Sequence, residues 1–299
     1  MESPSQRSTA ETARAYWELM RLDRPVGSLL LLWPTLAALW IAEEGTPPIP
    51  ILVIFVLGTF VMRAAGCVIN DLADQDFDPH VERTRSRPLA DGRLKTKDAL
   101  VCLAFLLLIG FCLVLSLNVT TWWMALGGVL ISAIYPFMKR FTHLPQLILG
   151  VAFSWGILMA GTAISNAISL PIFCFFAMSF VWIVAYDTQS AMVDREDDLK
   201  IGLKYTAILL GWLDRYVIAA LQLTVLALLL VLGAIAKLNV LFLFSTVVVA
   251  CLFFYQSCLT WSRKREHCFR AFKNNATVGL VLFTGIVLNY MVAVPGHQL

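Results

Sequence analysis

The sequence predicts an all-α integral membrane protein with nine transmembrane helices. Hydrophobic residues make up 59% of its 299 residues and charged residues only 14%, whereas soluble domains carry about 25% charged residues. The apolar residues gather in runs of about 20, the number that a helix needs to cross roughly 30 Å of hydrocarbon. Lys and Arg cluster in alternate connections between these runs, as expected when positive charge stays in the cytoplasm.

The nine predicted spans follow one another along the chain. They are 26–43, 50–69, 99–117, 120–138, 145–165, 168–186, 216–236, 238–259 and 276–294. We expect a single membrane domain over residues 1–299. Its polar residues 1–24 should form a cytoplasmic tail, and residues 70–97 and 187–205 should form cytoplasmic motif and cap regions.

The positive charges predict the orientation of the chain. With the N-terminus in the cytoplasm, 21 of the 23 Lys and Arg residues fall in the tail or in cytoplasmic connections. The two others are Lys237, in an outer loop, and Arg63, within the second span. The tail lacks the order of a signal peptide, and its acidic residues argue against a mitochondrial transit peptide. We therefore expect a bacterial inner membrane protein with a periplasmic C-terminus.

Two acidic motifs directly follow the second and the sixth span. They are NDLADQDFD at 70–78 and DTQSAMVDREDD at 187–198. The spacing in each motif places three carboxylates on one helical face. These are Asp71, Asp74 and Asp78 in the first motif, and Asp187, Asp194 and Asp198 in the second. Each motif is expected to continue its transmembrane helix as a carboxylate stripe at the water boundary.

The stripes predict a magnesium site. Like charges one turn apart destabilise a helix, and divalent cations would offset that cost. Oxygen ligands suit Mg²⁺. One motif alone could be a solvated acidic loop, but two at equivalent depth favour metal binding. Asp74 and Asp194 are 120 residues apart, or four spans, which suggests two four-helix halves plus one helix. We expect a central cavity between them, open to the cytoplasm and laterally to lipid.

Basic residues complement the acids. Arg83 and Arg87 follow the first motif, and Lys200 and Lys204 follow the second. Arg and Lys can stabilise a leaving diphosphate as its bond breaks, although positive-inside residues are common at such places. Arg63 lies within a span, where an ionisable residue marks a functional site by default. We expect it to pair with an anionic group of the substrate or with phosphate.

The two motifs resemble those of the UbiA superfamily of membrane prenyltransferases. Residues 70–78 fit the pattern NDxxDxxxD, and Asp194 and Asp198 fit DxxxD. The similarity extends from LDRPVG at 22–27 to FKNNATVG at 272–279. The amino-acid sequence around the second motif is similar to that of family members that prenylate 4-hydroxybenzoate in ubiquinone biosynthesis.

The resemblance implies Mg²⁺, a polyprenyl diphosphate donor, 4-hydroxybenzoate as acceptor and a lipid environment, with no nucleic-acid partner. By motif position, the metal ligands would be Asp71, Asp74, Asp78, Asp194 and Asp198. Contacts to diphosphate or acceptor would come from Arg63, Asn70, Arg83 and Arg87. Residues in YPFMKR that match the family's inner-loop group are Tyr135, Lys139 and Arg140.

The implied reaction moves the prenyl group to the ring carbon next to the acceptor's hydroxyl and releases diphosphate. Its expected catalytic residues are Arg63, Asp71, Asp187 and Asp194, and the sequence does not choose between Asp187 and Asp194 as the base. Another aromatic acceptor, such as a naphthoate, homogentisate or a porphyrin-type ring, is an alternative, as is a polyprenyl-processing enzyme without one. A transporter is the main alternative outside enzymes, but transporter sites lie near the midplane of the bilayer.

Overall fold

The chain folds into a bundle of long helices. The structure, a computed structural model, describes residues 8–138, 141–142, 144–201 and 206–292, with the side chains of 196–201 left out. Over these ranges it contains no strand. The long helices are α2 Val26–Glu43, α3 Ile49–Ala73, α4 Thr96–Leu115, α5 Val119–Met138, α6 Pro145–Ser165, α7 Leu170–Ile201, α9 Asp214–Ile235, α10 Val240–Trp261 and α11 Arg265–Val292. The short ones are α1 Thr9–Leu19, η2 Asp78–His80, α8 Thr206–Leu210 and η3 Gly211–Leu213.

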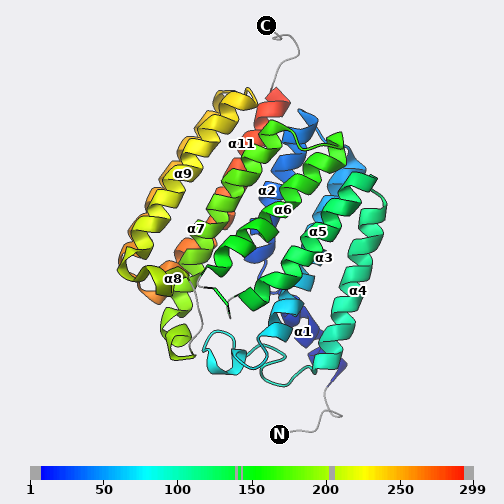
Figure 1. Cartoon of the computed structure of the whole chain (residues 1–299), viewed down its shortest axis with the longest axis vertical. Helices are drawn as coiled ribbons and strands as arrows, with labels where there is room; N and C mark the ends of the chain where they lie inside the picture. The colour runs from blue at the N-terminus through cyan, green and yellow to red at the C-terminus, as the bar shows by residue number, and fades with distance from the viewer. Residues whose placement is uncertain (1–7, 139–140, 143, 202–205, 293–299) are drawn as a thin grey trace.

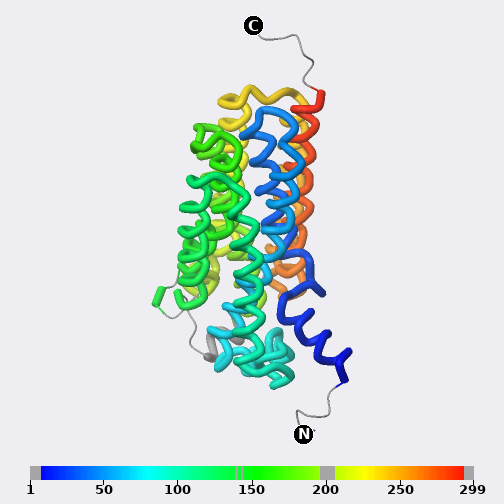
Figure 2. Tube along the Cα trace, turned by 90° about the vertical axis from the view of Figure 1, so that its right-hand side faces the viewer, coloured from blue at the N-terminus to red at the C-terminus, as the bar shows by residue number. Residues whose placement is uncertain are grey.

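Nine helices in the described part are long and apolar enough to cross a membrane, which confirms the predicted span count. They run side by side, and the two chain ends emerge at opposite ends of the bundle (Figure 1). Seen from the side, α1 and the segment after α3 gather at the N-terminal end (Figure 2). We call this the motif end, because both acidic motifs lie there.

The packed centre of the bundle is formed by α2, α6, α7 and α11. Helix α2 packs on α6 and α11, while α7 packs on α6 and α9. Trp182, Phe175 and Tyr186 of α7 are fully buried there. Large apolar side chains on the outer helices are exposed instead, among them Phe105 and Phe254. Such an apolar exterior suits lipid rather than water.

A chain of buried amides fixes α7 against α10 and α11. Gln189 donates to Gln256 (3.1 Å), and Asn275 donates to Gln189 (2.9 Å). Trp182 donates its indole N–H to Asn275 (2.9 Å), and Gln222 of α9 donates to Gln256 (2.8 Å). Each of these polar groups would be costly without a partner in a membrane interior. The network therefore holds the helix that carries the second motif in a defined position.

Three helices extend more than three residues beyond their predicted spans. The continuation of α3 and α7 into the acidic motifs was expected, although α3 continues only as far as Ala73, whereas the early start of α11 was not expected. Helix α3 continues past residue 69 to Ala73, and α7 continues past residue 186 to Ile201. Helix α11 begins at Arg265 rather than at residue 276. At α11 the helix extends beyond its apolar run, which alone set the predicted boundary of that span. The backbone hydrogen bonds of a helix continue into water where polar side chains solvate its surface.

Candidate active site

A large cavity lies between α2, α3, α4, α5 and α6, and residues of α1, α7 and α11 also line it. Its volume is about 2370 Å³, whereas pockets for small molecules measure roughly 300–1,000 Å³. Carboxylates and arginines line it at the motif end, including Asp71, Arg87 and Asp194. Apolar side chains line it at the other end, where α4 ends and α5 begins, including Leu117 and Val119. One continuous space therefore joins a charged mouth to an apolar channel.

The first motif turns a corner instead of continuing as a helix. Helix α3 ends at Ala73, so Asp71 lies in its last turn and Asp74 is its C-cap. Asp78 lies in the separate 3₁₀ turn η2. The predicted helical stripe through all three carboxylates is therefore wrong at Asp78. Proline disfavours a helical conformation in the residue before it, and Pro79 follows Asp78 directly.

The corner still gathers the three carboxylates, because local hydrogen bonds fold the chain back. The backbone N–H of Asp78 donates to the carbonyl of Asp74 (2.9 Å). Thr84 donates its hydroxyl to the carbonyl of Asp78 (2.9 Å). Asp71, Asp74 and Asp78 are 1%, 3% and 5% exposed. Asn70 donates its side-chain amide to Asp74 (3.1 Å).

Arg87 neutralises part of this carboxylate cluster. Its Nη1 lies 2.7 Å from Asp78 Oδ2 and 3.1 Å from Asp71 Oδ1. Burial would lower the pKa of Arg87, but the charges of Asp71 and Asp78 outweigh burial and raise it. Burial raises the pKa of Asp78, and the attraction of Arg87 offsets only part of this effect. The cluster therefore contains more negative charge than one arginine stabilises.

A second arginine reaches Asp71 from the N-terminal segment. Arg21 donates through Nη2 to both carboxylate oxygens of Asp71, at 2.7 and 2.8 Å. Its backbone is left-handed, with φ 56°, a conformation uncommon for residues other than glycine. The sequence does not reveal a role for Arg21, because nothing along the chain relates it to a residue 50 positions away.

Arg83 connects the first motif to the second. It donates from Nε to both carboxylate oxygens of Asp194, at 3.0 and 2.8 Å. A further hydrogen bond runs from its Nη2 to Asp194 Oδ2. Asp194 is 7% exposed and lies on α7, as does Asp187. The structure thus brings segments 111 residues apart to one side of the cavity.

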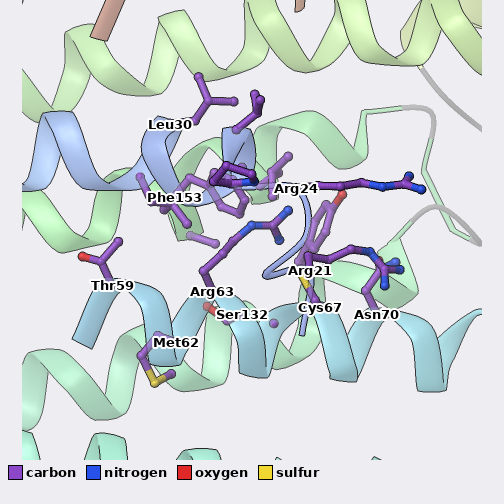
Figure 3. Close-up of a pocket in the computed structure, with 18 of the residues that line it drawn as sticks. Arg21, Arg24, Leu30, Thr59, Met62, Arg63, Cys67, Asn70, Ser132 and Phe153 are labelled. Carbon is purple, nitrogen blue, oxygen red and sulfur yellow. The ribbon is translucent and has the colours of Figure 1, made fainter. Parts of the chain in front are cut away.

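Deeper in the cavity, Arg63 points away from its own helix. It projects from α3 towards Phe153 and Leu30 (Figure 3), and its guanidinium carbon lies 5.6 Å from the centroid of the Phe153 ring. A Cβ at Gly27 would lie 2.6 Å from its Nη2, so a larger residue there would displace the guanidinium. Among the described residues its buried Nε has no hydrogen-bond partner. Such a group suits an anionic ligand.

Two tyrosines and Asp187 surround the same part of the cavity. Tyr135, Tyr186 and Asp187 all line it. The hydroxyl of Tyr186 is buried and has no hydrogen-bond partner in the described part of the chain. The rings of Tyr186 and Trp182 pack edge to face, and their centroids are 5.6 Å apart. Tyr186 was not among the predicted site residues, although it directly precedes the second motif.

Helix α1 covers part of the cavity mouth. It lies in the segment 1–24, which was predicted only as a polar cytoplasmic tail. Its N-terminus is a capping box formed by Ser8 and Glu11. Glu18 accepts a hydrogen bond from Arg93 Nη1, which ties α1 to the loop after the first motif. Glu11, Glu18 and Arg93 all line the cavity. The Ser-x-x-Glu pattern of the cap was the signal that could have found this helix.

Several predicted site residues lie outside the described part of the chain. These are Lys139, Arg140 and Lys204, together with the side chains of Asp198 and Lys200. Within the described part, no group of three His, Cys, Asp or Glu side chains could hold a metal ion as it stands. There Asp71, Asp78 and Asp194 are paired with arginines.

Comparison with known sequences gives close relatives over nearly the whole chain. The model of the family described as "UbiA prenyltransferase family" matches residues 31–284. The 4-hydroxybenzoate octaprenyltransferase of Tolumonas auensis is 54% identical over 273 residues, which cover 91% of this chain and 96% of that protein. The protein of the same name from Vibrio cholerae is 51% identical over 281 residues, 94% of this chain and 99% of that protein.

Solved structures share the fold at much lower identity. The apo structure of a UbiA homolog from Aeropyrum pernix K1 has a TM-score of 0.78 at 22% identity, and the match covers 87% of this chain and 97% of that one. The structure of a UbiA homolog from Archaeoglobus fulgidus bound to GPP and Mg²⁺ has a TM-score of 0.70 at 16% identity, covering 91% and 99%.

Proposed function

Because the chain belongs to the UbiA prenyltransferase family, we propose that it transfers a polyprenyl group from polyprenyl diphosphate to 4-hydroxybenzoate. The bond forms at the ring carbon next to the hydroxyl, and diphosphate leaves, as a step of ubiquinone biosynthesis. Relatives that are about half identical over nearly their full length carry this activity in their names. The single observation that carries the proposal is the ion pair between Arg83 and Asp194, which joins the two acidic motifs beside one cavity.

The protein is a multi-pass membrane protein, and the bacterial inner membrane is its proposed location. The motif end would face the cytoplasm, because the N-terminus and α1 lie there (Figure 2) and positive residues remain cytoplasmic. The C-terminus would then be periplasmic. In this orientation a water-soluble acceptor reaches the charged mouth directly from the cytoplasm.

The proposed cofactor is Mg²⁺. Carboxylate oxygens are the donors that it prefers, and the described residues place four buried carboxylates beside the charged mouth. Its ligands would come from Asp71, Asp74, Asp78 and Asp194, with Asp198 as the fifth by motif position. When bound, Mg²⁺ supplies positive charge that neutralises the diphosphate as it leaves. A UbiA homolog from Archaeoglobus fulgidus was solved with Mg²⁺ and GPP, which supports this assignment.

The arginines of the site would bind the diphosphate. Arg83 and Arg87 carry fixed charge beside the carboxylates, and charge aimed at a leaving group stabilises it without reorganisation. Since Arg83, Arg87 and Arg21 pair with aspartates in this structure, their charge is already balanced. Donor binding would exchange these partners for phosphate oxygens. Lys139, Arg140, Lys200 and Lys204 remain proposed contacts by sequence alone.

Arg63 would bind the carboxylate of the acceptor. Its buried Nε lies in the inner part of the cavity and has no hydrogen-bond partner among the described residues. A guanidinium there can bind a carboxylate substituent of the ring through charge-assisted hydrogen bonds. Tyr135 and Tyr186 flank the same space and offer hydroxyl groups to the acceptor. Asn70 orders the first motif through Asp74.

We assign the general base to Asp187 rather than to Asp194. Asp194 is held by three hydrogen bonds from Arg83 and is a proposed metal ligand, so both of its carboxylate oxygens are already engaged. Asp187 lines the cavity beside Tyr186, two helical turns before Asp194 on the same helix. After the ring attacks the allylic carbon, Asp187 would remove the ring proton. Asp71 would assist as a ligand of the metal that binds the leaving group.

The apolar channel would hold the prenyl tail. Its walls are aliphatic and aromatic side chains of α3, α4, α5 and α6, such as Phe55, Leu113, Val114, Trp122 and Met159. Helix α4 packs on α3 and α5 packs on α6, while α4 and α5 barely touch each other. The tail can therefore enter from lipid between α4 and α5 without passing through water.

The test is transfer by the purified protein in lipid vesicles. Labelled 4-hydroxybenzoate, octaprenyl diphosphate and Mg²⁺ should give a prenylated product, and chelation of the metal should abolish it. The acceptors naphthoate and homogentisate are included in parallel. A product from one of these alone, with none from 4-hydroxybenzoate, would contradict the proposed acceptor.

A further inference from the structure

Trp155 of α6 is part of the wall of the apolar channel, between its charged mouth and its far end. It lines the cavity, as do its neighbours Gly156 and Ala152. Helix α5 packs beside α6 and shows how far Trp155 lies from the proposed acceptor site. Tyr135 of α5 is at the level of the acceptor, and Gly128 of α5, which touches the indole, is seven residues away. At 1.5 Å per residue this is about 10 Å. The channel continues past this level to Val119, near the opposite membrane surface.

The indole is held by two independent features of α5. Its N–H donates to the carbonyl of Met124 at 2.6 Å. Its ring covers two successive glycines. A Cβ at Gly127 would lie 3.0 Å from Trp155 Cζ2, and a Cβ at Gly128 would lie 2.7 Å from Cδ1. No side chain fits between the helix and the ring, so the indole lies flat against the backbone of α5 and leaves the channel open beside it.

We propose that Trp155, seated on Gly127 and Gly128, determines the specificity of the enzyme for long prenyl donors. A prenyl chain long enough to pass this level gains contact with a rigid aromatic wall, whereas a short chain ends before it. Because apolar contact stabilises binding in proportion to its area, the wall favours long donors. This inference rests on the proposed function, since it assigns the prenyl tail to the channel.

Substitutions at Trp155 and at Gly128 have opposite steric effects, but both are predicted to weaken the binding of long donors. Trp155→Ala removes the wall, and a long chain loses its contact. Gly128→Ala adds a methyl group where the ring lies, so the indole must leave its seat, and the channel beside it is its nearest free space. Both changes should weaken long donors selectively. Gly58→Ala is the matched control, because this glycine also lines the cavity and a Cβ there would meet nothing within 4 Å.

The experiment compares dimethylallyl diphosphate, with one isoprene unit, and octaprenyl diphosphate as competing donors. The measured quantity is the ratio of kcat/KM for the long donor to that for the short donor. Partial misfolding lowers both values equally and cancels in this ratio. Trp155→Ala and Gly128→Ala should lower the ratio roughly tenfold, Trp155→Phe should lower it less, and Gly58→Ala should leave it within about twofold. An unchanged ratio in Trp155→Ala and Gly128→Ala, or an equal fall in Gly58→Ala, would overturn the inference.

Ligand-induced stabilisation provides a readout that does not require turnover. Octaprenyl diphosphate should raise the Tm of the parent protein more than dimethylallyl diphosphate does, because a tighter ligand stabilises the folded state more. The difference should shrink in Trp155→Ala and persist in Gly58→Ala. If the parent protein forms no product but this pattern holds, the proposed reaction fails while the role of Trp155 stands. If product forms and Trp155→Ala shows no length-dependent loss in either assay, the proposed reaction stands and the role of Trp155 fails.

Discussion

Arg83 donates three hydrogen bonds to the carboxylate of Asp194, 111 residues further along the chain. Arg83 follows the first acidic motif and Asp194 belongs to the second, so this single pair joins both halves of the charged mouth. Asp194 is almost completely buried. A buried carboxylate is costly without such a partner, and diphosphate offers Arg83 an alternative one.

The first prediction concerns the metal ligands. Asp194→Asn replaces a charged oxygen donor by a neutral amide and removes the partner of Arg83. We expect transfer to fall at least about 100-fold, with an increased requirement for Mg²⁺, while the protein still inserts into membranes. Initial rates over a range of Mg²⁺ concentrations measure the effect. Near-normal turnover in this variant would contradict the assignment.

Asp214→Asn is the matched control. Asp214 is also fully buried and bonded to an arginine, Arg263 Nη2 at 2.6 Å, but it does not line the cavity. The loss of this pair should reduce stability and leave the dependence of the rate on Mg²⁺ unchanged.

The second prediction separates the acceptor from the donor. Arg63→Gln removes the cation proposed to bind the acceptor's carboxylate. Since hydrogen bonds to charged groups contribute about 1.5–3 kcal/mol, the KM for 4-hydroxybenzoate should rise roughly 10- to 100-fold, with little change in the KM for the donor. The methyl ester of 4-hydroxybenzoate lacks the negative charge, so the substitution should barely affect it. A rise in the donor KM alone would place Arg63 on the diphosphate instead.

The third prediction concerns the pH dependence of α1 docking. Burial would raise the pKa of Glu18, but hydrogen bonds from Arg93 and Arg14 outweigh it and lower the pKa below its ordinary value of 4.5. A lowered pKa means that the folded state favours the charged form. The contribution of Glu18 is therefore fully present above pH 4.5 and is lost as the pH falls through the lowered value.

Hydrogen exchange of the α1 amides, measured across the acidic range, tests this expectation. Protection should decrease as Glu18 becomes protonated. Glu18→Gln should show weaker protection at neutral pH and a flatter dependence on pH. If Glu18→Gln keeps both the neutral protection and the acidic transition of the parent protein, another group controls docking.

The fourth prediction concerns the buried amide network. Gln256→Leu leaves the side chains of Gln189 and Gln222 without their acceptor. We expect the free energy of unfolding to fall by roughly 1–2 kcal/mol, seen as a lower Tm in detergent. Thr224→Val is the control, because Thr224 is exposed and bonds only its own helix, at the carbonyl of Ala220. An equal loss in both variants would show that the network contributes nothing specific.

The sequence predicted the transmembrane helices well because the bilayer imposes their composition. A span must be apolar over its length, and this property is local. The predicted span 26–43 coincides with α2, and 145–165 coincides with α6. The start of α11 was missed because its polar extension depends on helix packing rather than on the bilayer.

The site was predictable only where its geometry follows from local spacing along one helix. Spacing placed Asp187 and Asp194 on one helix, and the structure agrees. Spacing placed Asp78 on a helix with Asp71, and the structure does not, because the helix ends at Ala73. Arg21 and Tyr186 were missed because their importance arises from contacts across the fold. No local pattern relates Arg21 to Asp71, and a single tyrosine in an apolar run is usually a packing residue.

The most direct test of the account is an experimental structure with Mn²⁺ in place of Mg²⁺ and a non-hydrolysable octaprenyl thiolodiphosphate. Anomalous scattering locates the metal independently of the protein. The account predicts metal ions between the first motif and Asp194, bridged by one diphosphate, with the prenyl chain passing Trp155. Metal bound to one motif alone, with the diphosphate outside the space between Asp71 and Asp194, would contradict it.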